Sequence, residues 1–118
     1  MYHVIFVCKY RKRLLEPINS DLKQIILEIE KGSNFEILEM ETDKDHLHML
    51  IKSDPKTSIL AIVRKLKQET TYRLWKAKES YLRKFFWKEH TLWTDGYFAS
   101  SIGNVSQETA EAYIRNQG

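Results

Sequence analysis

The sequence predicts an α+β domain of the ferredoxin-like, split βαβ type: an antiparallel sheet, helices on one face and one additional C-terminal helix. Three observations predict it. First, β-rich apolar runs and helical periodicities follow each other in the order βαββαβα. Second, the chain has 118 residues, 42% of them hydrophobic, which suits a single domain over residues 1–118. Third, only 4 Gly and 2 Pro are present, which excludes disordered and collagen-like chains.

The first half of the chain supplies three strands and one helix. Residues 2–8 form a β-rich apolar run, which predicts the first strand. Apolar residues recur at helical spacing over 18–31, and Gly32 follows as a typical helix stop. Residues 34–41 and 46–52 are strand-like and are joined by a short polar turn, so we expect a hairpin.

The second half supplies two helices and a fourth strand. Thr57 or Ser58 can cap a long helix, whose apolar positions share one face up to about Lys78. Residues 92–102 have a β-rich centre and predict the last strand. A C-terminal helix over about 107–117 follows a Gly-Asn turn.

Neither a membrane span nor a signal peptide is indicated. No apolar run approaches the ~18 to 20 residues that a bilayer span requires, and Met1 leads directly into the strand-like run. The single Cys8 cannot form an internal disulfide, and its apolar neighbours predict a reduced, buried thiol. We therefore expect a cytoplasmic protein.

Charge is strongly segregated along the chain, although the net charge is only +3. Residues 1–13 carry four basic and no acidic side chains, and residues 56–88 carry ten basic and two acidic ones. Both segments also contain aromatic side chains, a combination that favours binding to a nucleic-acid backbone. The alternative is that the aromatic residues belong to the core and the lysines are simply solvated.

Two histidines form the first candidate for chemistry. His46 and His48 alternate with apolar residues in a predicted strand, so both imidazoles project from one face of the sheet. From this spacing both rings can turn toward a single cation. A third ligand is needed, and Asp43, Asp45, Glu39 or a residue of the last helix could supply it. Two solvated or hydrogen-bonded histidines are the alternative.

The predicted C-terminal helix carries the second candidate. Tyr113 and Gln117 are four residues apart and therefore lie on one helical face. A phenol beside an amide oxygen would offer a nucleophile and a hard metal ligand on one rigid element. Alternatively, Tyr113 packs as an ordinary helical aromatic and Gln117 is solvated.

Four segments, in this order, resemble a known family. They are Lys9-Tyr10-Arg11-Lys12, His46-Leu47-His48, the run from Trp93 to Gly103, and Tyr113-Ile114-Arg115-Asn116-Gln117. Together they strongly resemble the HUH single-tyrosine transposases of IS200-like insertion sequences and the related transposases associated with repetitive extragenic palindromes. The resemblance extends over nearly the whole chain.

The resemblance implies a DNA transposase that cuts and rejoins single-stranded DNA at hairpin-containing element ends. By this resemblance Tyr113 is the nucleophile that forms a 5′-phosphotyrosine, and His46, His48 and Gln117 bind a divalent metal, Mg²⁺ or Mn²⁺. It also implies a homodimer with composite active sites, in which the tyrosine helix acts in its own or in the other subunit.

The basic segments supply candidate contacts to the DNA backbone. Those in the loop after the first strand and on the long helix are Arg11, Lys12, Arg13, Arg64, Lys65, Lys67, Arg73 and Lys76. An aromatic residue such as Trp75 or Trp87 would either stack on an unpaired base or pack in the core.

Three other functions remain open at the level of the sequence. The first is a non-catalytic module that binds hairpins or single-stranded nucleic acid on the same fold. The second is a metal-dependent phosphoesterase that activates water at the histidine pair, and the third is a structural domain with incidental histidines.

Overall fold

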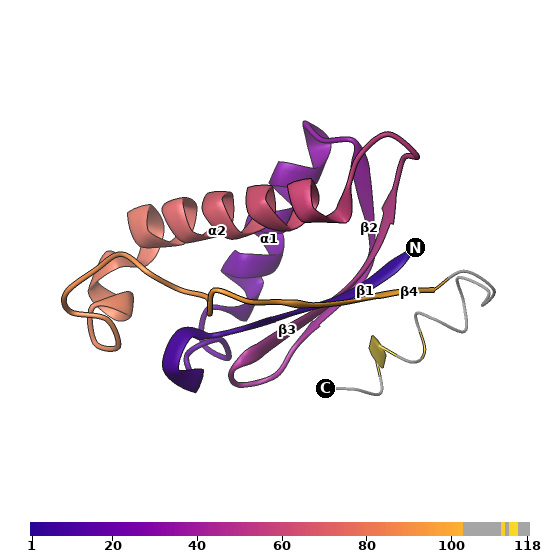
Figure 1. The fold of residues 1–118 in the computed structure, drawn as a ribbon. Helices are drawn as coiled ribbons and strands as arrows, with labels where there is room; N and C mark the ends of the chain where they lie inside the picture. Colours follow the sequence, from indigo (N-terminus) through magenta and orange to yellow (C-terminus); the bar gives the residue numbers. More distant parts are fainter. Residues whose placement is uncertain (103–111, 113, 116–118) are drawn as a thin grey trace.

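A computed structural model describes residues 1–102, 112, 114 and 115 (Figure 1). The first three strands, with their helix and a short 3₁₀ turn, run as β1 (Tyr2–Val7), η1 (Lys9–Arg11), α1 (Asn19–Lys31), β2 (Phe35–Thr42) and β3 (His46–Ser53). A long helix α2 (Ile59–Leu82) and the short strand β4 (Phe98–Ser101) follow. The expected order of strands and helices is confirmed up to β4.

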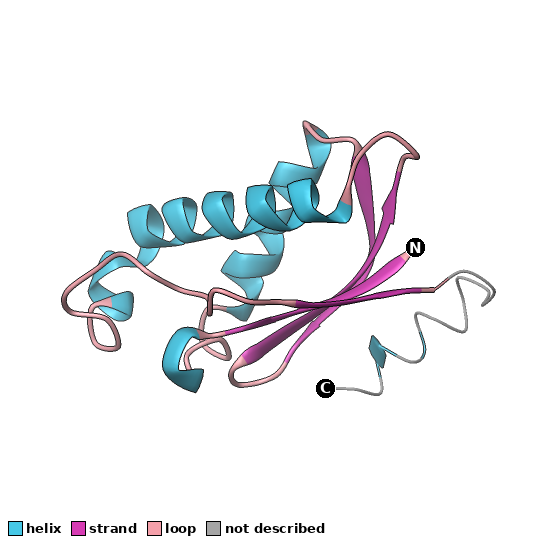
Figure 2. Ribbon diagram, in the orientation of Figure 1, coloured by secondary structure: helices cyan, strands magenta, loops and turns pink. Residues whose placement is uncertain are grey.

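The strands form one sheet in the order β2-β3-β1-β4, with every neighbouring pair antiparallel. This order is that of the ferredoxin-like fold, because β1 and β3 are central and each helix returns the chain across the same face. Helices α1 and α2 both lie over that face (Figure 2). The predicted α+β class and the split βαβ arrangement are therefore confirmed.

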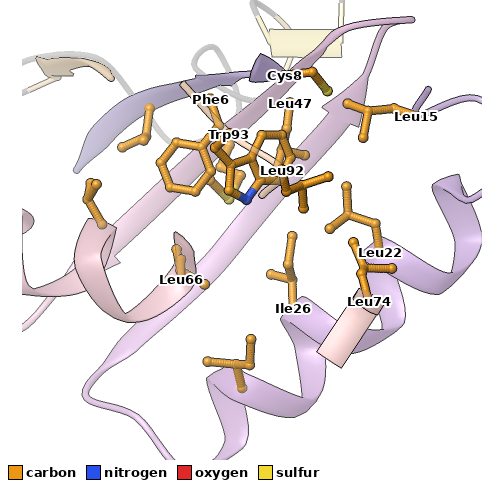
Figure 3. Packing of buried hydrophobic residues seen from close by; sticks show 14 of the residues in the cluster. Phe6, Cys8, Leu15, Leu22, Ile26, Leu47, Leu66, Leu74, Leu92 and Trp93 are labelled. Carbon is orange, nitrogen blue, oxygen red and sulfur yellow. The ribbon is translucent and has the colours of Figure 1, made fainter. Parts of the chain in front are cut away.

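The core fills the space between the sheet and the two helices (Figure 3). Phe6 of β1 and Leu47 of β3 point toward Leu22 and Ile26 of α1 and toward Leu66 of α2, and all five are fully buried. Because side chains alternate along a strand, the residues between these positions face the other side of the sheet. That other face carries the histidines.

Cys8 is fully buried at the end of this core, as expected for a reduced thiol. Burial, followed by the nearby charge of Asp45, raises the pKa of its thiol to about 12. The thiol therefore stays protonated at neutral pH and behaves as a small apolar side chain.

The long helix begins and ends much as its sequence predicts. The Ser58 hydroxyl accepts a hydrogen bond from the amide of Ala61 at 3.1 Å, so Ser58 is the N-cap. At Lys78, where the helix was expected to end, the backbone leaves helical geometry with φ −131° and ψ 37°. The helix resumes after this kink and continues to Leu82.

The last strand is shorter than expected. Only residues 98–101 of the predicted 92–102 form β4, although Trp93 makes one isolated bridge to Cys8. The pairing with β1 shifts register here, because Ile5 pairs with Phe98 whereas Cys8 bridges Trp93. Between these two positions the carbonyls of Thr94, Asp95 and Gly96 accept hydrogen bonds from the Lys67 ammonium. Most of the C-terminal helix predicted over 107–117 lies outside the described residues.

Candidate functional site

His46 and His48 lie side by side on the face of the sheet that the helices leave uncovered, as their alternation predicts. Their ring centroids are 5.9 Å apart. The alternating residues Leu47, Met49 and Ile51 are fully buried in the core on the opposite face. The alternation of polar and apolar residues in β3 therefore positions the pair.

A third histidine, which the sequence analysis did not single out, completes this cluster. His3 of β1 places Nε2 at 3.3 Å from Nδ1 of His48, and the two rings stack with centroids 5.6 Å apart. They come together because β1 and β3 are antiparallel with Ile5 opposite His48 and His3 opposite Leu50. The sequence signal for His3 was a polar residue in an otherwise apolar strand. Its contact with His48 depends on a strand register that brings together residues 45 positions apart.

Burial determines the charge state of the two contacting rings. His3 and His48 are 5% and 7% exposed. Burial lowers the pKa of His3, and it is also the main cause that lowers the pKa of His48, followed by the neighbouring His3 and His46 rings. Both imidazoles are therefore neutral at pH 7, which is the form that can bind a cation.

Two carboxylates approach His46 from the β2–β3 turn. Oδ1 of Asp45 lies 2.6 Å from Nδ1 of His46, and Oδ2 of Asp43 lies 3.8 Å from the same nitrogen. One ligand atom from each of these residues can lie within 4.8 Å of the other two. Asp45, only 8% exposed, also accepts a hydrogen bond from Nε of Arg11 at 3.0 Å.

The donor set fits a divalent cation. Although Asp45 is close, Nδ1 of His46 is buried and makes no aligned hydrogen bond with any described residue. A buried nitrogen without a hydrogen-bond partner, beside carboxylate oxygens, suits a metal ligand. Imidazole and carboxylate donors together are compatible with Mg²⁺ or Mn²⁺. His46 belongs to two candidate sets of metal ligands. One is the predicted set with His48 and Gln117, and the other is the carboxylate set with Asp43 and Asp45.

Tyr113 and Gln117 themselves lie outside the described residues, but neighbouring positions of the chain are described. Ala112, Ile114 and Arg115 are helical. Ile114 is fully buried against Leu50, and Nη1 of Arg115 donates to Oε2 of Glu39 on β2 at 2.8 Å. Leu50 follows His48 by two residues and pairs with His3 in the sheet register. Ile114 therefore contacts the same face of the sheet as the histidines.

Of the predicted DNA contacts, those after β1 are nearest to the histidines. Arg11 reaches the site directly through Asp45. Arg13 is exposed and Lys12 is partly exposed in the segment that follows η1. These cations lie at the same end of the sheet as the β2–β3 turn (Figure 1).

The predicted contacts on α2 lie on the other layer of the domain, because α2 covers the opposite face of the sheet (Figure 2). Arg64 is exposed, Nζ of Lys65 donates to the Ser33 hydroxyl at 2.6 Å, and Lys76 lies 6.0 Å from the centre of the Tyr72 ring. Arg73 pairs with Glu69 at 2.9 Å. The structure therefore does not bring the α2 cations together with the histidines.

Lys67 differs from the other cations of α2. Its ammonium donates to the carbonyls of Thr94, Asp95 and Gly96 at 2.7, 3.1 and 2.7 Å. It also lies 5.6 Å from the centre of the Phe6 ring. Burial lowers the pKa of this ammonium. An ammonium has three N–H donors, so these contacts use all of them.

The comparisons with known sequences agree with one another. The family model described as Transposase IS200 like matches residues 1–117. The ISDra2 transposase TnpA of Deinococcus radiodurans is 29% identical over 117 residues, which cover 98% of this chain and 82% of that protein. The transposase for insertion sequence element IS200 of Salmonella typhimurium is 27% identical over 121 residues, covering 98% of this chain and 75% of that protein.

Solved structures show the same fold. A crystal structure of a protein assigned as a transposase of Deinococcus radiodurans R1 has a TM-score of 0.77 at 27% identity, covering 98% of this chain and 88% of that one. A REP-associated tyrosine transposase bound to a REP hairpin has a TM-score of 0.67 at 15% identity, covering 96% of this chain and 61% of that one. Within the described residues, no helix is long and apolar enough to cross a membrane.

Proposed function

The chain belongs to the family of IS200-like transposases, and we propose that it cuts and rejoins single-stranded DNA at hairpin-containing ends of an insertion element. The observation that carries this proposal is the histidine face of the sheet. The neutral imidazoles of His3 and His48, the buried Nδ1 of His46 and the helical residue Ile114 all lie on that face. A binding module without chemistry would not require this combination.

The metal in this proposal is Mg²⁺ or Mn²⁺, bound by His46, His48 and Gln117. Asp45 and Asp43 stand close enough to His46 to ligate the ion directly or to orient the imidazole. Held by these residues, the ion would polarise a non-bridging oxygen of the scissile phosphate and would offset charge in the transition state. Arg11, paired with Asp45, holds this carboxylate in position.

Tyr113 is the nucleophile in this proposal. The ordinary pKa of tyrosine is about 10, so only ~0.1% is phenolate at neutral pH and the attack needs assistance. The phenolic oxygen attacks the phosphorus, the bond to the 3′ oxygen breaks, and the products are a 5′-phosphotyrosine and a free 3′-OH that takes up the proton. A second 3′-OH reverses the step and rejoins the strand. The packing of Ile114 against Leu50 supports a tyrosine helix at the histidine face.

The DNA partner in this proposal is a hairpin formed by a folded single strand. The fold is shared with a REP-associated transposase whose structure contains a REP hairpin. Arg11, Lys12 and Arg13 would contact phosphates next to the reacting one, and the α2 cations, apart from Lys67, would contact phosphates farther along the strand. The cleavage and rejoining of DNA would take place in the cytoplasm.

We also propose that the protein acts as a homodimer with composite active sites. Strand β4 is short and pairs only with β1 among the described strands, and Phe98 on it is 53% exposed. An exposed edge strand of this kind is a natural surface for pairing with a second copy.

The experiment that tests the proposed function looks for a covalent intermediate. Labelled single-stranded oligonucleotides that fold into hairpins are incubated with the protein in Mn²⁺ or EDTA, and denaturing gels reveal protein-linked DNA. We expect a Mn²⁺-dependent band that is absent in Tyr113→Phe and in His46→Ala. His90→Ala is the matched control, because His90 stacks on Trp75 away from the site, with ring centroids 4.2 Å apart.

Other outcomes would identify the alternative functions. Metal-dependent cleavage that persists in Tyr113→Phe without any protein-linked DNA would show a phosphoesterase that uses water. Salt-sensitive binding of hairpins without cleavage would show a binding module, provided that DNA from the flanks of the source insertion element is bound without cleavage too.

A further inference from the structure

A surface hollow of about 500 Å³ lies where the segment after β1 meets the segment after α2. It is lined by Tyr10, Phe85, Phe86, Trp87, Lys88 and Glu89. Tyr10 belongs to η1, and the other residues follow α2, so two segments distant in sequence meet here (Figure 1). The Tyr10 and Phe86 rings are 6.5 Å apart between centroids.

Two aromatic side chains that line this hollow are exposed, whereas the two tryptophans elsewhere in the chain are buried. Tyr10 and Trp87 are each 69% exposed. Trp75 and Trp93 are 2% and 5% exposed, and their indole N–H groups donate to the Thr91 carbonyl and to the Thr70 hydroxyl. Packing in the core therefore accounts for Trp75 and Trp93, but it does not account for Trp87.

The backbone of η1 holds Tyr10 in an unusual conformation. Tyr10 and Arg11 both lie in the left-handed region, with φ of 59° and 53°, which residues other than glycine rarely adopt. Such residues cluster at ligand sites, where the surrounding structure holds them in place. Here the turn directs Tyr10 toward Phe86 and directs Arg11 toward Asp45, next to His46.

The charge around the hollow is complementary to a nucleic acid. The two segments that meet at the hollow, residues 9–13 and 83–88, contain seven basic side chains and no acidic one. Arg11 and Arg83 are paired with Asp45 and Glu79, and Lys88 lines the hollow itself. The one carboxylate of the lining, Glu89, is paired with Lys9 at 3.4 Å. Exposed aromatic rings beside a lysine match a nucleobase and its phosphate better than they match an apolar peptide.

We propose that this hollow is a stacking subsite for one unpaired base of the single-stranded DNA, with the base on Trp87 and Tyr10 and its flanking phosphate near Lys88. This inference rests on the proposed function, because it takes single-stranded DNA as the substrate. Arg11 and Asp45 connect the subsite to His46, so the stacked base belongs to the strand that enters the site. Stacking tolerates any base, and the subsite therefore fixes the path of the strand rather than its sequence.

The test uses the fluorescence of the tryptophans in the full chain, in EDTA so that no metal-dependent cleavage occurs. Because Trp75 and Trp93 are buried, quenching by DNA reports mainly on Trp87. We expect an unstructured oligothymidylate to quench the fluorescence, and an abasic strand of the same length and charge to quench it much less. Trp87→Leu should abolish the quenching and weaken binding by roughly 5- to 100-fold, while Trp87→Phe retains most of the affinity.

Salt dependence separates stacking from charge. The slope of binding affinity against salt should be unchanged in Trp87→Leu, because no phosphate contact is lost, and it should be reduced by about one ion in Lys88→Ala. Circular dichroism on each variant establishes that it is folded.

Three results would overturn the subsite. Equal quenching by the abasic strand, or wild-type affinity in Trp87→Leu, would show that no base stacks there. Shielding of Trp87 from acrylamide that grows with protein concentration, without DNA, would show that a second copy covers the hollow. If the wild-type protein still forms the Mn²⁺-dependent adduct in those cases, the proposed function stands and only the subsite fails. If no strand binds at all, both fail.

Discussion

His3 links the two central strands at the point where the candidate metal ligands stand. With Nδ1 of His48 engaged by Nε2 of His3 at 3.3 Å, Nε2 of His48 is the nitrogen left to meet a cation. That geometry requires the proton of neutral His48 to be on Nδ1, with His3 accepting it. His3 is therefore a positioning residue, and it acts through His48.

We predict that His3→Phe weakens Mn²⁺ binding about 10- to 100-fold, because it keeps a ring beside His48 but removes the nitrogen that orients it. Mn²⁺ electron paramagnetic resonance measures this affinity without DNA or turnover. His3→Gln should recover part of the loss, since its amide can hydrogen-bond to His48. His90→Phe is the control, and an unchanged affinity in a folded His3→Phe protein would contradict the positioning role.

At the scale of single residues, alternation along the strand predicted the histidine pair but not its third member. His46 and His48 share a strand, so a period of two is enough to place both on one face. Asp45, next to His46 in the sequence, was among the expected third ligands, but His3 joins the pair only through the register between β1 and β3. That register is a long-range property, which depends on how distant segments pair.

Among the elements, α2 and the segment before β4 are joined by the Lys67 ammonium. The sequence shows Lys67 as one cation of a basic helix, and only the fold shows that three carbonyls face it. The same contact lies at the register shift that separates β4, which begins at Phe98, from the bridge at Trp93. The charge pattern of a sequence thus indicates where cations gather, but not which of them form hydrogen bonds within the protein.

We predict that Lys67→Met lowers the free energy of unfolding by about 1 to 3 kcal/mol, because three carbonyls lose a charged donor. Lys65→Met, two positions earlier on the helix and more exposed, should change it by less than about 0.5 kcal/mol. Urea unfolding measures both. Equal stability of the two variants, together with a larger loss of DNA affinity in Lys67→Met, would instead identify Lys67 as a phosphate contact.

For the whole molecule, the order of elements was predictable because each strand and helix has a local signature. The expected hairpin, the Ser58 cap and the core face of β3 all follow from residues close in sequence. The division of the cations between two layers follows from the topology, which puts α2 on one face and the histidines on the other. No local sequence pattern predicts that the α2 cations and the histidines lie on opposite faces of the sheet.

Burial of two neutral histidines also makes the stability of the whole fold depend on pH. Burial lowers the folded-state pKa of His3 and His48 below the ordinary value of 6.5, so the unfolded chain binds these protons more readily than the folded one. Their contribution is fully present above pH 6.5 and is lost as the pH falls through the lower folded-state values.

We therefore predict that the melting temperature of the metal-free protein falls as the pH is lowered from 7.5 to 5.5, a window in which most carboxylates stay ionised. Calorimetry in EDTA measures it. The double variant His3→Phe, His48→Phe should flatten this dependence, because it removes both buried imidazoles, whereas His90→Gln, at an exposed position, should leave the slope unchanged. A wild-type melting temperature that stays constant over this window would show that His3 and His48 are not held neutral in the folded state.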